Sequence, residues 1–469
     1  PELRAADPDH RAVGMVVAAD KLEGLQDRHD ALDTGDLREL LGHLLLLALV
    51  PFAVTAGEVP AGFLRTRGRD LVTSEGTVFQ PRGIGLGNWL VPEGYMFKFK
   101  TASAPREIAA LIEMAIGKEE ASRFWDTFRD RYVAKEDIDF IAKAGFNTVR
   151  VPLHFNLFMR EEAPFNAVGE GKIVFDGPGW ALLDRVIGWS RDAGLKVIID
   201  LHAAPGGQTG VNHDDGTGFP LIFYLERERR RTKAFWEAIA RRYRDEPAVL
   251  GYELLNEPIS TYNDEALLNQ RLEPIYRELT AAIRAIDPHH IIILSGAQWD
   301  QNFAPFGPPF APNLVYTYHK FWSVTGRDAV HDYIAFSRQH RVPILLGEAG
   351  EAANEWNAKF RTLNERFGFG WSFWTYKNLA STSTIASVPM PQGWHKLAAL
   401  GSMFSPSLEK VGLTREEARR ILNAYLEAIR FSNTRLNACY LRSLDKAPWL
   451  EEECRADEAK KRALGLKPD

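Results

Sequence analysis

The stretch that decides the fold is GYELLNEP at residues 251–258, a short apolar run that ends in an amide, a carboxylate and a proline. The apolar residues 249–255, which two prolines bound, predict a buried strand of a parallel sheet. Asn256 and Glu257 then follow the strand, where α/β sheets and barrels bind their ligands, so Glu257 is a candidate catalytic acid. Taken alone, the Asn-Glu-Pro tripeptide favours an ordinary strand-to-helix connection.

Seven further apolar runs of strand length accompany this one. Helix-like segments such as 180–193 and 265–285 separate most neighbouring runs, which predicts right-handed crossovers in a parallel sheet. Eight such units can close on themselves, so we expect an α/β fold of the (β/α)8 TIM barrel type, with a doubly wound sheet as the alternative. The runs are residues 82–87, 148–151, 196–201, 250–255, 291–295, 314–318, 342–346 and 371–374.

The two ends of the chain differ from this regular pattern. Residues 1–38 are polar and charged with weak periodicity, and we expect a disordered or non-native leader. Residues 39–57 hold the run LLLLALV and a small-residue exit, which is typical of a secretory signal peptide and predicts a secreted or periplasmic protein; a core helix is the alternative. We place the catalytic barrel at residues 63–400 and a C-terminal extension of helices and tail, packed on the barrel, at 401–469.

Composition narrows the class of partner. Hydrophobic residues make up 45%, charged residues 25% and the net charge is −5, so no basic surplus indicates a nucleic-acid partner. The 12 Trp, 13 Tyr and 27 Phe fit either sugar stacking or a large aromatic core. Cys439 and Cys454 can form at most one disulfide. We expect a monomer, and no membrane span once residues 39–57 are removed.

Polar side chains follow most of the predicted strands. Each alone has a structural alternative, such as a buried ion pair or a core histidine, but side chains from different strands converge at one end of a barrel. Two glutamates there suit glycosidic-bond hydrolysis, because one can protonate the leaving oxygen while the other stabilises the oxocarbenium-like centre. The side chains are Arg150, His154, His202, Asn256, Glu257, His319, Glu348 and Trp374.

These residues lie in motifs that resemble glycoside hydrolase family 5, the cellulase family of clan A. The motifs span about residues 63–400 and read RGIGLGNWL (82–90), GFNTVRVP (145–152), DLH (200–202), LNEP (255–258) and LGE (346–348). The resemblance implies a retaining β-glycosidase with Glu257 as general acid/base and Glu348 as nucleophile. It implies a β-linked oligo- or polysaccharide substrate, with no cofactor and no metal.

The same resemblance implies roles for the other candidates. Arg150 would neighbour the nucleophile, Asn256 would hold the sugar 2-hydroxyl, His202 and His319 would line the catalytic subsite, and Trp374 would stack on a sugar ring. His154 is a further candidate for substrate binding. The loops around Trp89 and Asn212 resemble those of the exo-β-1,3-glucanase and related bacterial branches, so we include both residues in the expected binding site.

One position departs from the family pattern. After the sixth strand the family usually has His, any residue and Tyr, whereas this chain has His319, Lys320 and Phe321. The hydroxyl that commonly contacts the nucleophile is therefore missing, and Tyr318 should face away from His319 in a strand. This affects the tuning of Glu348 and leaves its identity unchanged.

Three functions agree with these features. The first is hydrolysis of a β-glucan or β-glucoside by a retaining mechanism with two glutamates. The second is a carbohydrate-binding barrel without activity, and the third applies the same mechanism to a glycolipid or to transglycosylation. A zinc site is disfavoured because the spacing of residues 200–202 and 213–215 fits no zinc pattern. Family resemblance does not select the linkage.

Overall fold

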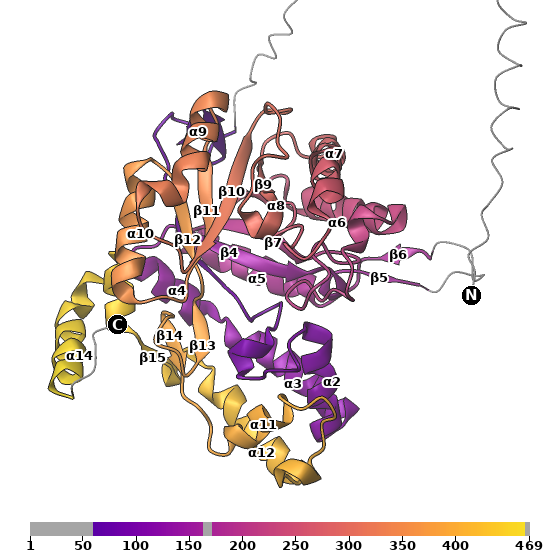
Figure 1. Cartoon of the computed structure of the whole chain (residues 1–469), viewed down its shortest axis with the longest axis vertical. Helices are drawn as coiled ribbons and strands as arrows, with labels where there is room; N and C mark the ends of the chain where they lie inside the picture. Colours follow the sequence, from indigo (N-terminus) through magenta and orange to yellow (C-terminus); the bar gives the residue numbers. More distant parts are fainter. Residues whose placement is uncertain (1–59, 163–170, 465–469) are drawn as a thin grey trace, which may run out of the picture. The chain divides into compact units, whose positions relative to one another are not determined.

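The computed structural model describes residues 60–162 and 171–464, all of which belong to one unit, Glu58–Asp469 (Figure 1). The predicted leader at residues 1–38 and the signal-like segment 39–57 lie outside the described residues. Within the described ranges, no helix combines the length and the apolar character that crossing a membrane requires.

The centre of the unit is a closed barrel of eight parallel strands (Figure 1). β12 pairs with β3, which closes the sheet and confirms the predicted (β/α)8 TIM barrel over the doubly wound alternative. In order around the barrel the strands are β3 (Arg82–Gly85), β4 (Thr148–His154), β7 (Lys196–Ala203), β8 (Val249–Glu253), β9 (Ile291–Ser295), β10 (Leu314–Phe321), β11 (Ile344–Gly350) and β12 (Gly370–Phe373).

The end of the barrel at which the strands begin is filled with aliphatic side chains. Leu250, Ile291 and Leu345 belong to one buried cluster with Leu64 and Leu71. The last two come from the hairpin of β1 (Leu64–Arg67) and β2 (Asp70–Thr73), which covers this end. Because this end is closed by apolar packing, a ligand has to enter at the opposite end, where the strands finish.

Helices surround the barrel between successive strands (Figure 1). α7 illustrates why they form: Asp264 caps its first turn by accepting from the Leu267 N–H, and a buried stripe that includes Leu268, Leu272 and Tyr276 faces inward. The helices are α4 (Lys135–Lys143), α5 (Gly179–Asp192), α6 (Glu226–Tyr243), α7 (Glu265–Arg284), the single-turn α8 (Ala297–Asp300), α9 (His331–His340) and α10 (Asn354–Arg366).

Four further helices pack together beside the barrel (Figure 1). They are α2 (Pro105–Ile116) and α3 (Lys118–Tyr132), which precede β4, and α11 (Trp394–Leu400) and α12 (Arg415–Ala428) from the C-terminal part. Aromatic rings join them: Trp394 and Tyr425 lie 4.6 Å apart between ring centroids, and Phe128 lies 6.2 Å from Tyr425. Part of the aromatic excess therefore serves as packing, as the large-core alternative expects.

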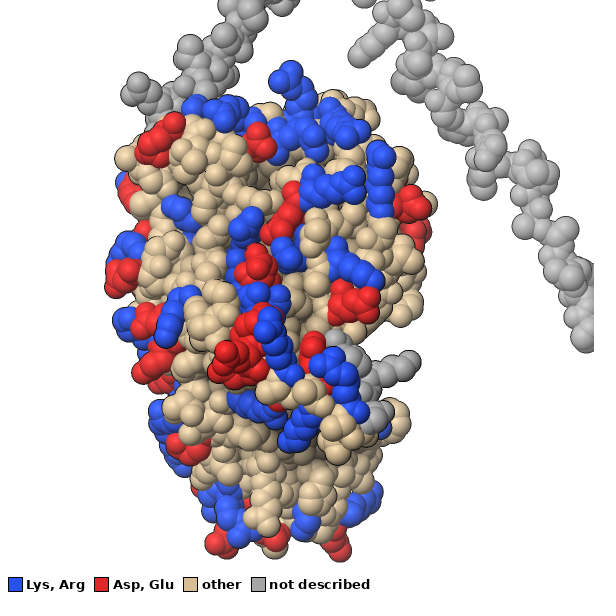
Figure 2. Space-filling view, turned by 90° about the vertical axis from the view of Figure 1, so that its left-hand side faces the viewer, with Lys and Arg blue, Asp and Glu red and all other residues tan. Residues whose placement is uncertain are grey.

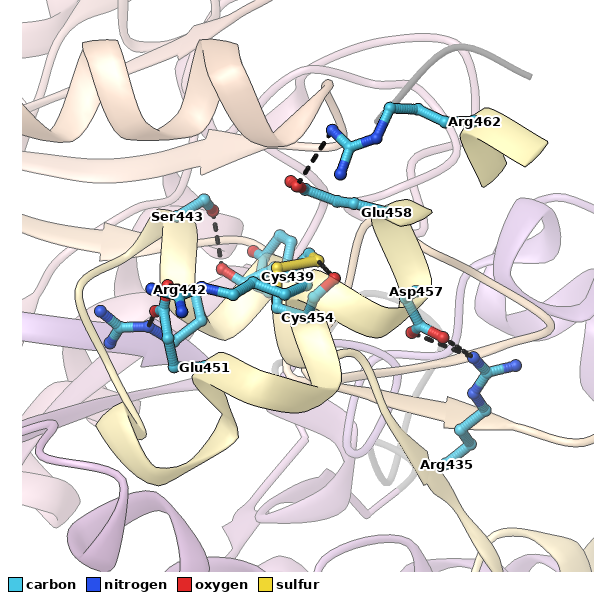
Figure 3. The surroundings of a disulfide bond; sticks show 11 residues. Arg435, Cys439, Arg442, Ser443, Glu451, Cys454, Asp457, Glu458 and Arg462 are labelled. Atoms are coloured by element: carbon cyan, nitrogen blue, oxygen red, sulfur yellow. Dashed lines mark hydrogen bonds and ion pairs between the residues drawn. A yellow bond between two sulfur atoms is a disulfide. The ribbon is translucent and has the colours of Figure 1, made fainter. Parts of the chain in front are cut away.

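A small sheet joins the C-terminal segment to the chain that follows β12, and a disulfide links two helices within the segment. The sheet holds β13 (Lys377–Leu379), β14 (Ala386–Val388) and β15 (Arg435–Leu436). Cys439 in α13 (Ala438–Ser443) is bonded to Cys454 in α14 (Glu451–Ala463), so the one bridge that the sequence allows is formed (Figure 3). An ion pair of 2.7 Å between Arg442 and Glu451 joins the same two segments.

Acidic and basic side chains are mixed across the face of the unit in Figure 2. Across the described residues, exposed acidic and basic side chains also form pairs, such as Arg160 with Asp176 at 2.8 Å. A face of mixed charge agrees with the absence of a basic surplus in the composition.

Candidate active site

A pocket of about 580 Å³ opens where the strands of the barrel end. The segments that follow β3, β7, β8, β9, β10, β11 and β12 all contribute to its wall, so the convergence expected of a barrel is present. The lining residues are Glu93, Tyr95, His202, Asn212, His213, Glu257, Trp299, Gln301, His319, Phe321, Trp322, Glu348, Glu351 and Trp374.

Hydrogen bonds to the backbone of Asn256 fix the loop after β8 that presents Glu257. Asn256 N–H donates to the Leu201 oxygen at 3.1 Å, which continues the pairing of β7 with β8 beyond the end of β8. Gln208 Nε2 donates to the backbone oxygens of His202 at 2.7 Å and of Asn256 at 2.9 Å. Glu257 itself adopts a left-handed backbone conformation, φ 45°, of the kind that is often found at functional sites.

Arg150 is fully buried and joins four acidic or amide side chains from other strands; we call these five residues the Arg150 cluster. Its guanidinium donates to both oxygens of Glu253, at 2.8 and 2.7 Å, and to Asn256 Oδ1 at 2.7 Å. It also lies 3.1 Å from Asp200 Oδ2 and donates to Glu348 Oε1. This fork of charged hydrogen bonds holds Glu348 in place and favours its ionised form.

Glu257 and Glu348 face one another across His319. One oxygen of each carboxyl lies within 4.8 Å of the other and of a His319 nitrogen. His319 Nδ1 is 2.8 Å from Glu257 Oε1 and 3.6 Å from Glu348 Oε2. His319 and Glu348 are register partners on β10 and β11, which accounts for this close approach.

Burial separates this pair of carboxyls from ordinary surface acids. Burial raises the pKa of Glu348 to about 7, and it raises the pKa of Glu257 as well. Two carboxyls this close compete for one proton, so the pair keeps a proton at higher pH than an ordinary surface acid does. Because Arg150 contacts Glu348 directly, the shared proton rests on Glu257.

His202 and Trp374 form a flat wall of the pocket. Their rings stack with centroids 5.7 Å apart and an interplanar angle of 1°. Trp374 Nε1 donates to the Tyr95 hydroxyl at 2.9 Å, and His202 Nδ1 lies 2.8 Å from Asp200 Oδ2. Burial lowers the pKa of His202 well below its usual range, so this wall carries a neutral imidazole.

Two of the predicted binding residues lie elsewhere. Trp89 and His154 line a neighbouring hollow with Asp215 and do not line the pocket of the two glutamates. Trp89 is buried and its Nε1 donates to the Arg129 backbone oxygen at 2.8 Å, while His154 Nε2 lies 3.2 Å from Asp215 Oδ2. The structure brings Asn212, His202, His319 and Trp374 to the pocket wall, with Arg150 and Asn256 buried behind it.

Several lining residues were not anticipated from the sequence. Glu351 directly follows the last residue of β11, with φ 49°, and Trp322 directly follows β10, with φ 50°. From the loop around Trp89 the sequence predicts only Trp89 as a binding residue, yet this loop places the carboxyl of Glu93 in the pocket. A carboxylate three residues after a predicted nucleophile is a signal that could have been used for Glu351.

Phe321 lines the pocket at the position where the family pattern has tyrosine. Tyr318 does not replace it, because its hydroxyl donates to Asn364 on α10, on the side of β10 away from the pocket. This confirms the predicted orientation of Tyr318 relative to His319.

Two groups of the pocket region have the spacing of metal ligands. Glu257, His319 and Glu348 form one, and Glu253, Asp300 and His319 form the other. The guanidinium of Arg150 contacts Glu253 and Glu348, so it already supplies a positive charge to both groups. This charge disfavours a metal ion at either position.

Comparisons with known proteins agree with this geometry. The family model described as Cellulase (glycosyl hydrolase family 5) matches residues 114–380. A protein named Beta-xylosidase from Phanerodontia chrysosporium is 30% identical over 275 residues, which are 58% of this chain and 52% of that protein. Probable glucan 1,3-beta-glucosidase A from Aspergillus clavatus is 29% identical over 259 residues, which are 54% of this chain and 58% of that protein.

Among solved structures, rutinosidase from Aspergillus niger has a TM-score of 0.51 at 18% identity, covering 65% of this chain and 92% of that one, which shows a shared fold. The chain spans about half the length of the curated relatives that it matches. The family model covers more than half of the chain and contains β4, β7, β8, β10 and β11 with their polar ends. The chain belongs to the cellulase family, glycosyl hydrolase family 5.

Proposed function

We propose that the protein is a retaining β-glycosidase in which Glu348 is the nucleophile and Glu257 is the general acid/base. The observation that carries this proposal is the approach of the two carboxyls, with an oxygen of one within 4.8 Å of an oxygen of the other, in a pocket of about 580 Å³. Retaining glycosidases place their carboxyl groups about 5–5.5 Å apart, whereas inverting enzymes need roughly 6.5–9.5 Å to admit a water molecule.

The reaction has two displacements. Glu348 attacks the anomeric carbon while Glu257 gives its proton to the leaving oxygen, and a covalent glycosyl-enzyme forms. Water then attacks the same carbon from the side of the departed group, Glu257 takes the water's proton, and the bond to Glu348 breaks. Arg150 keeps Glu348 ionised before the first step and stabilises the carboxylate that the second step releases.

The remaining wall residues hold the sugar in the catalytic subsite. The flat face made by Trp374 and His202 suits the apolar face of a pyranose ring. Asn256 Nδ2 lies 3.5 Å from His202 Nε2 and is the amide donor for the sugar 2-hydroxyl. His319 and Asn212 complete the polar side of the subsite. Trp89 and His154 can contact substrate only beyond this pocket, in the neighbouring hollow.

The substrate that we propose is a β-linked glucan or a related β-glycoside. The names of the relatives support this class, because one is a glucan 1,3-β-glucosidase and another a β-xylosidase. Both names describe cleavage of β-linked sugars, and the pocket needs no cofactor for that chemistry.

A panel of aryl β-glycosides and β-glucans, with product stereochemistry followed by proton NMR, tests the proposal. The wild-type protein should release a product of retained configuration. Glu348→Gln should lower kcat by at least about 10³-fold while substrate still binds. Glu278→Gln, on the exposed face of α7, is the matched control and should behave as wild type. Inversion of configuration would overturn the assignment of Glu348.

A carbohydrate-binding barrel without activity is the alternative from another class. It predicts that wild type and Glu348→Gln bind the same oligosaccharides and are equally inactive on the whole panel. Unequal turnover of the two proteins excludes it.

A transfer reaction or a glycolipid substrate is favoured by one observation at the mouth of the pocket. Trp322 lines the pocket but is 74% exposed, and its Nε1 donates to the Glu351 backbone oxygen at 3.2 Å. An exposed tryptophan held in this way offers a surface for an acceptor sugar or an apolar aglycone. Added alcohol or disaccharide acceptors should then yield transfer products at the expense of hydrolysis.

We also propose that the protein is secreted or periplasmic and acts as a monomer. The disulfide between Cys439 and Cys454 supports an oxidising compartment, and the run at residues 39–57 supports an export signal. Expression of the full chain with a C-terminal tag, followed by N-terminal sequencing of the exported protein, tests cleavage after this run. Gel filtration with light scattering tests the monomer.

A further inference from the structure

Asp300 is a fully buried carboxyl behind the pocket, without a hydrogen-bonding partner for either oxygen among the described residues. Its Oδ2 lies 3.1 Å from His319 Nε2, which likewise has no aligned partner there. On the other side of the same ring, Nδ1 lies 2.8 Å from Glu257 Oε1. The imidazole therefore stands between a buried acid and the acid/base glutamate.

The turn that presents Asp300 has an unusual backbone. Gln298, Trp299 and Asp300 have φ values of 49°, 62° and 61°, so three successive residues other than glycine are left-handed. Such conformations cost on the order of 1–3 kcal/mol each and persist where the surroundings impose them. The turn brings Trp299 to the pocket wall and Asp300 to the back of His319, which gives this strained geometry a functional reason.

The neighbours of Asp300 do not satisfy its carboxyl. Tyr276 on α7 donates its hydroxyl to the Ser295 oxygen at 2.9 Å, and Tyr333 on α9 donates to the Gln301 oxygen at 2.9 Å. The charged groups that act on it from the barrel side are Glu253, Glu257, Arg150 and Glu348, and Arg150 is already engaged with three carboxylates. His319 Nε2 is thus the partner that remains.

We propose that Asp300 is a positioning residue for the reaction. Its protonated carboxyl donates an O–H···N hydrogen bond to His319 Nε2, so the imidazole is held as the Nδ1–H tautomer. That N–H is directed at Glu257 Oε1. The tautomer is a property of the folded protein, and its consequence for catalysis rests on the proposed function of Glu257.

The protonation states of both groups support this direction. Burial raises the pKa of Asp300 well above its usual range, and the nearby Glu253 and Glu257 raise it further, so the carboxyl is neutral and can donate. Burial lowers the pKa of His319 to about 4, so the ring is a neutral imidazole at working pH and one of its nitrogens must accept.

The tautomer decides which oxygen of Glu257 carries the catalytic proton. If Nδ1–H donates to Oε1, that oxygen acts as an acceptor and the acidic proton belongs on Oε2. Oε2 lies 3.7 Å from Nε2 of His213, a residue of the pocket wall, and is therefore on the side from which a leaving oxygen can be protonated. The opposite tautomer would draw the proton of Glu257 toward His319 and away from substrate.

Nitrogen NMR of protein labelled with 15N-histidine tests the tautomer without any turnover. The His319 signals are assigned with the His319→Gln variant. Wild type and Asp300→Asn, whose amide can also donate to Nε2, should show the Nδ1–H pattern, and Asp300→Leu should lose it. An Nε2–H or imidazolium pattern in wild type at pH 6 overturns the proposal, whether or not the protein proves to be a glycosidase.

The pH profile then tests the consequence for Glu257. A donated N–H stabilises the ionised form of Glu257, so its loss in Asp300→Leu should raise the pKa of this acid and shift the basic limb of kcat/KM to higher pH. We expect kcat to fall about 10- to 100-fold in Asp300→Leu, with KM little changed, and about threefold or less in Asp300→Asn. A basic limb that moves to lower pH, or a loss of kcat without any shift, contradicts the proposal.

Thr280→Val is the matched control for loss of a buried polar group. Thr280 lies on α7, is buried, and its hydroxyl also lacks a partner among the described residues. The pH profile of kcat/KM for Thr280→Val should match that of wild type. A loss of kcat in this variant as large as in Asp300→Leu would attribute both effects to general destabilisation and overturn the positioning role.

Discussion

The Arg150 cluster and the mouth of the pocket are built in opposite ways. The cluster consists of Arg150, Asp200, Glu253, Asn256 and Glu348, which lie on strands or directly after one and are joined by charged hydrogen bonds in a fully or nearly buried setting. We define the mouth as Trp299, Phe321, Trp322 and Glu351, which are partly or largely exposed and lie at or beyond the ends of β9, β10 and β11. A rigid site for bond cleavage and an adaptable surface for substrate choice thus occupy separate layers.

The largest effect is expected from replacing Arg150, the centre of the cluster. Among the described residues, Arg150→Leu would leave the buried Glu253 with only the long hydrogen bond of 3.5 Å from the Ser295 hydroxyl. We therefore expect a loss of about 3–5 kcal/mol in the free energy of unfolding and a fall in kcat of at least about 10³-fold. Arg150→Lys keeps the positive charge but loses the bidentate hydrogen bonds of the guanidinium. Its free energy of unfolding and its kcat should lie between those of wild type and Arg150→Leu. Urea denaturation and steady-state kinetics measure both effects.

The control for this change is an arginine whose pair is exposed. Arg242 on α6 pairs with Asp184 on α5, and its side chain is 47% exposed. Arg242→Leu should cost less than about 1 kcal/mol, because solvent screens such pairs. If Arg150→Leu and Arg242→Leu lost the same free energy of unfolding, burial would not distinguish the Arg150 cluster from exposed ion pairs.

Dependence on pH is the next largest expected effect, and it reports the two glutamates, Glu348 of the cluster and Glu257 beside it. The active enzyme needs Glu348 ionised and Glu257 protonated. Because burial raises the pKa of Glu257, kcat/KM should stay high above the ordinary titration range of a glutamic acid and then decline by about tenfold per pH unit as Glu257 ionises. Kinetics from pH 4 to 9 measure this decline. An activity that rises steadily to pH 9 would contradict the assignment of the acid.

The two layers also differ in how far the sequence predicts them. Apolar runs predict the strands because burial in a parallel sheet demands them, and the polar residue after each run identifies Glu257, His202, His319 and Glu348. The inner partners Asp200 and Glu253 are harder to predict. They lie within strands, and only the closure of the barrel brings them to Arg150.

Loop residues are predicted least well because their directions depend on tertiary contacts. Trp89 and Asn212 both come from loops beyond strand ends, yet Asn212 reaches the pocket and Trp89 turns to the neighbouring hollow. Left-handed residues such as Trp299 and Trp322 redirect the chain although neither residue type signals a turn. Residue type alone therefore does not reveal which aromatic side chain faces a substrate.

A smaller effect is expected from changing the mouth without the cluster. Trp322→Ala should leave kcat on a small aryl glycoside within about twofold of wild type. On longer oligosaccharides kcat/KM should fall about 2- to 13-fold, since a lost stacking contact costs roughly 0.5–1.5 kcal/mol. Trp449→Ala removes another exposed tryptophan that does not line the pocket and is the control. Equal losses on short and long substrates would place Trp322 in the catalytic subsite instead.

The smallest expected effect lies where the two layers meet, at Phe321. Phe321→Tyr restores the hydroxyl that the family pattern has near the nucleophile, and that O–H can donate to Glu348. A donated hydrogen bond favours the ionised carboxylate, so the pKa of Glu348 should fall and the acidic limb of kcat/KM should move to lower pH, with kcat changed by less than about threefold. The basic limb, which reports Glu257, should stay in place. If the acidic and basic limbs of the kcat/KM profile move together, the new hydroxyl acts on the proton that Glu257 and Glu348 share. The mouth and the cluster would then be coupled at Phe321.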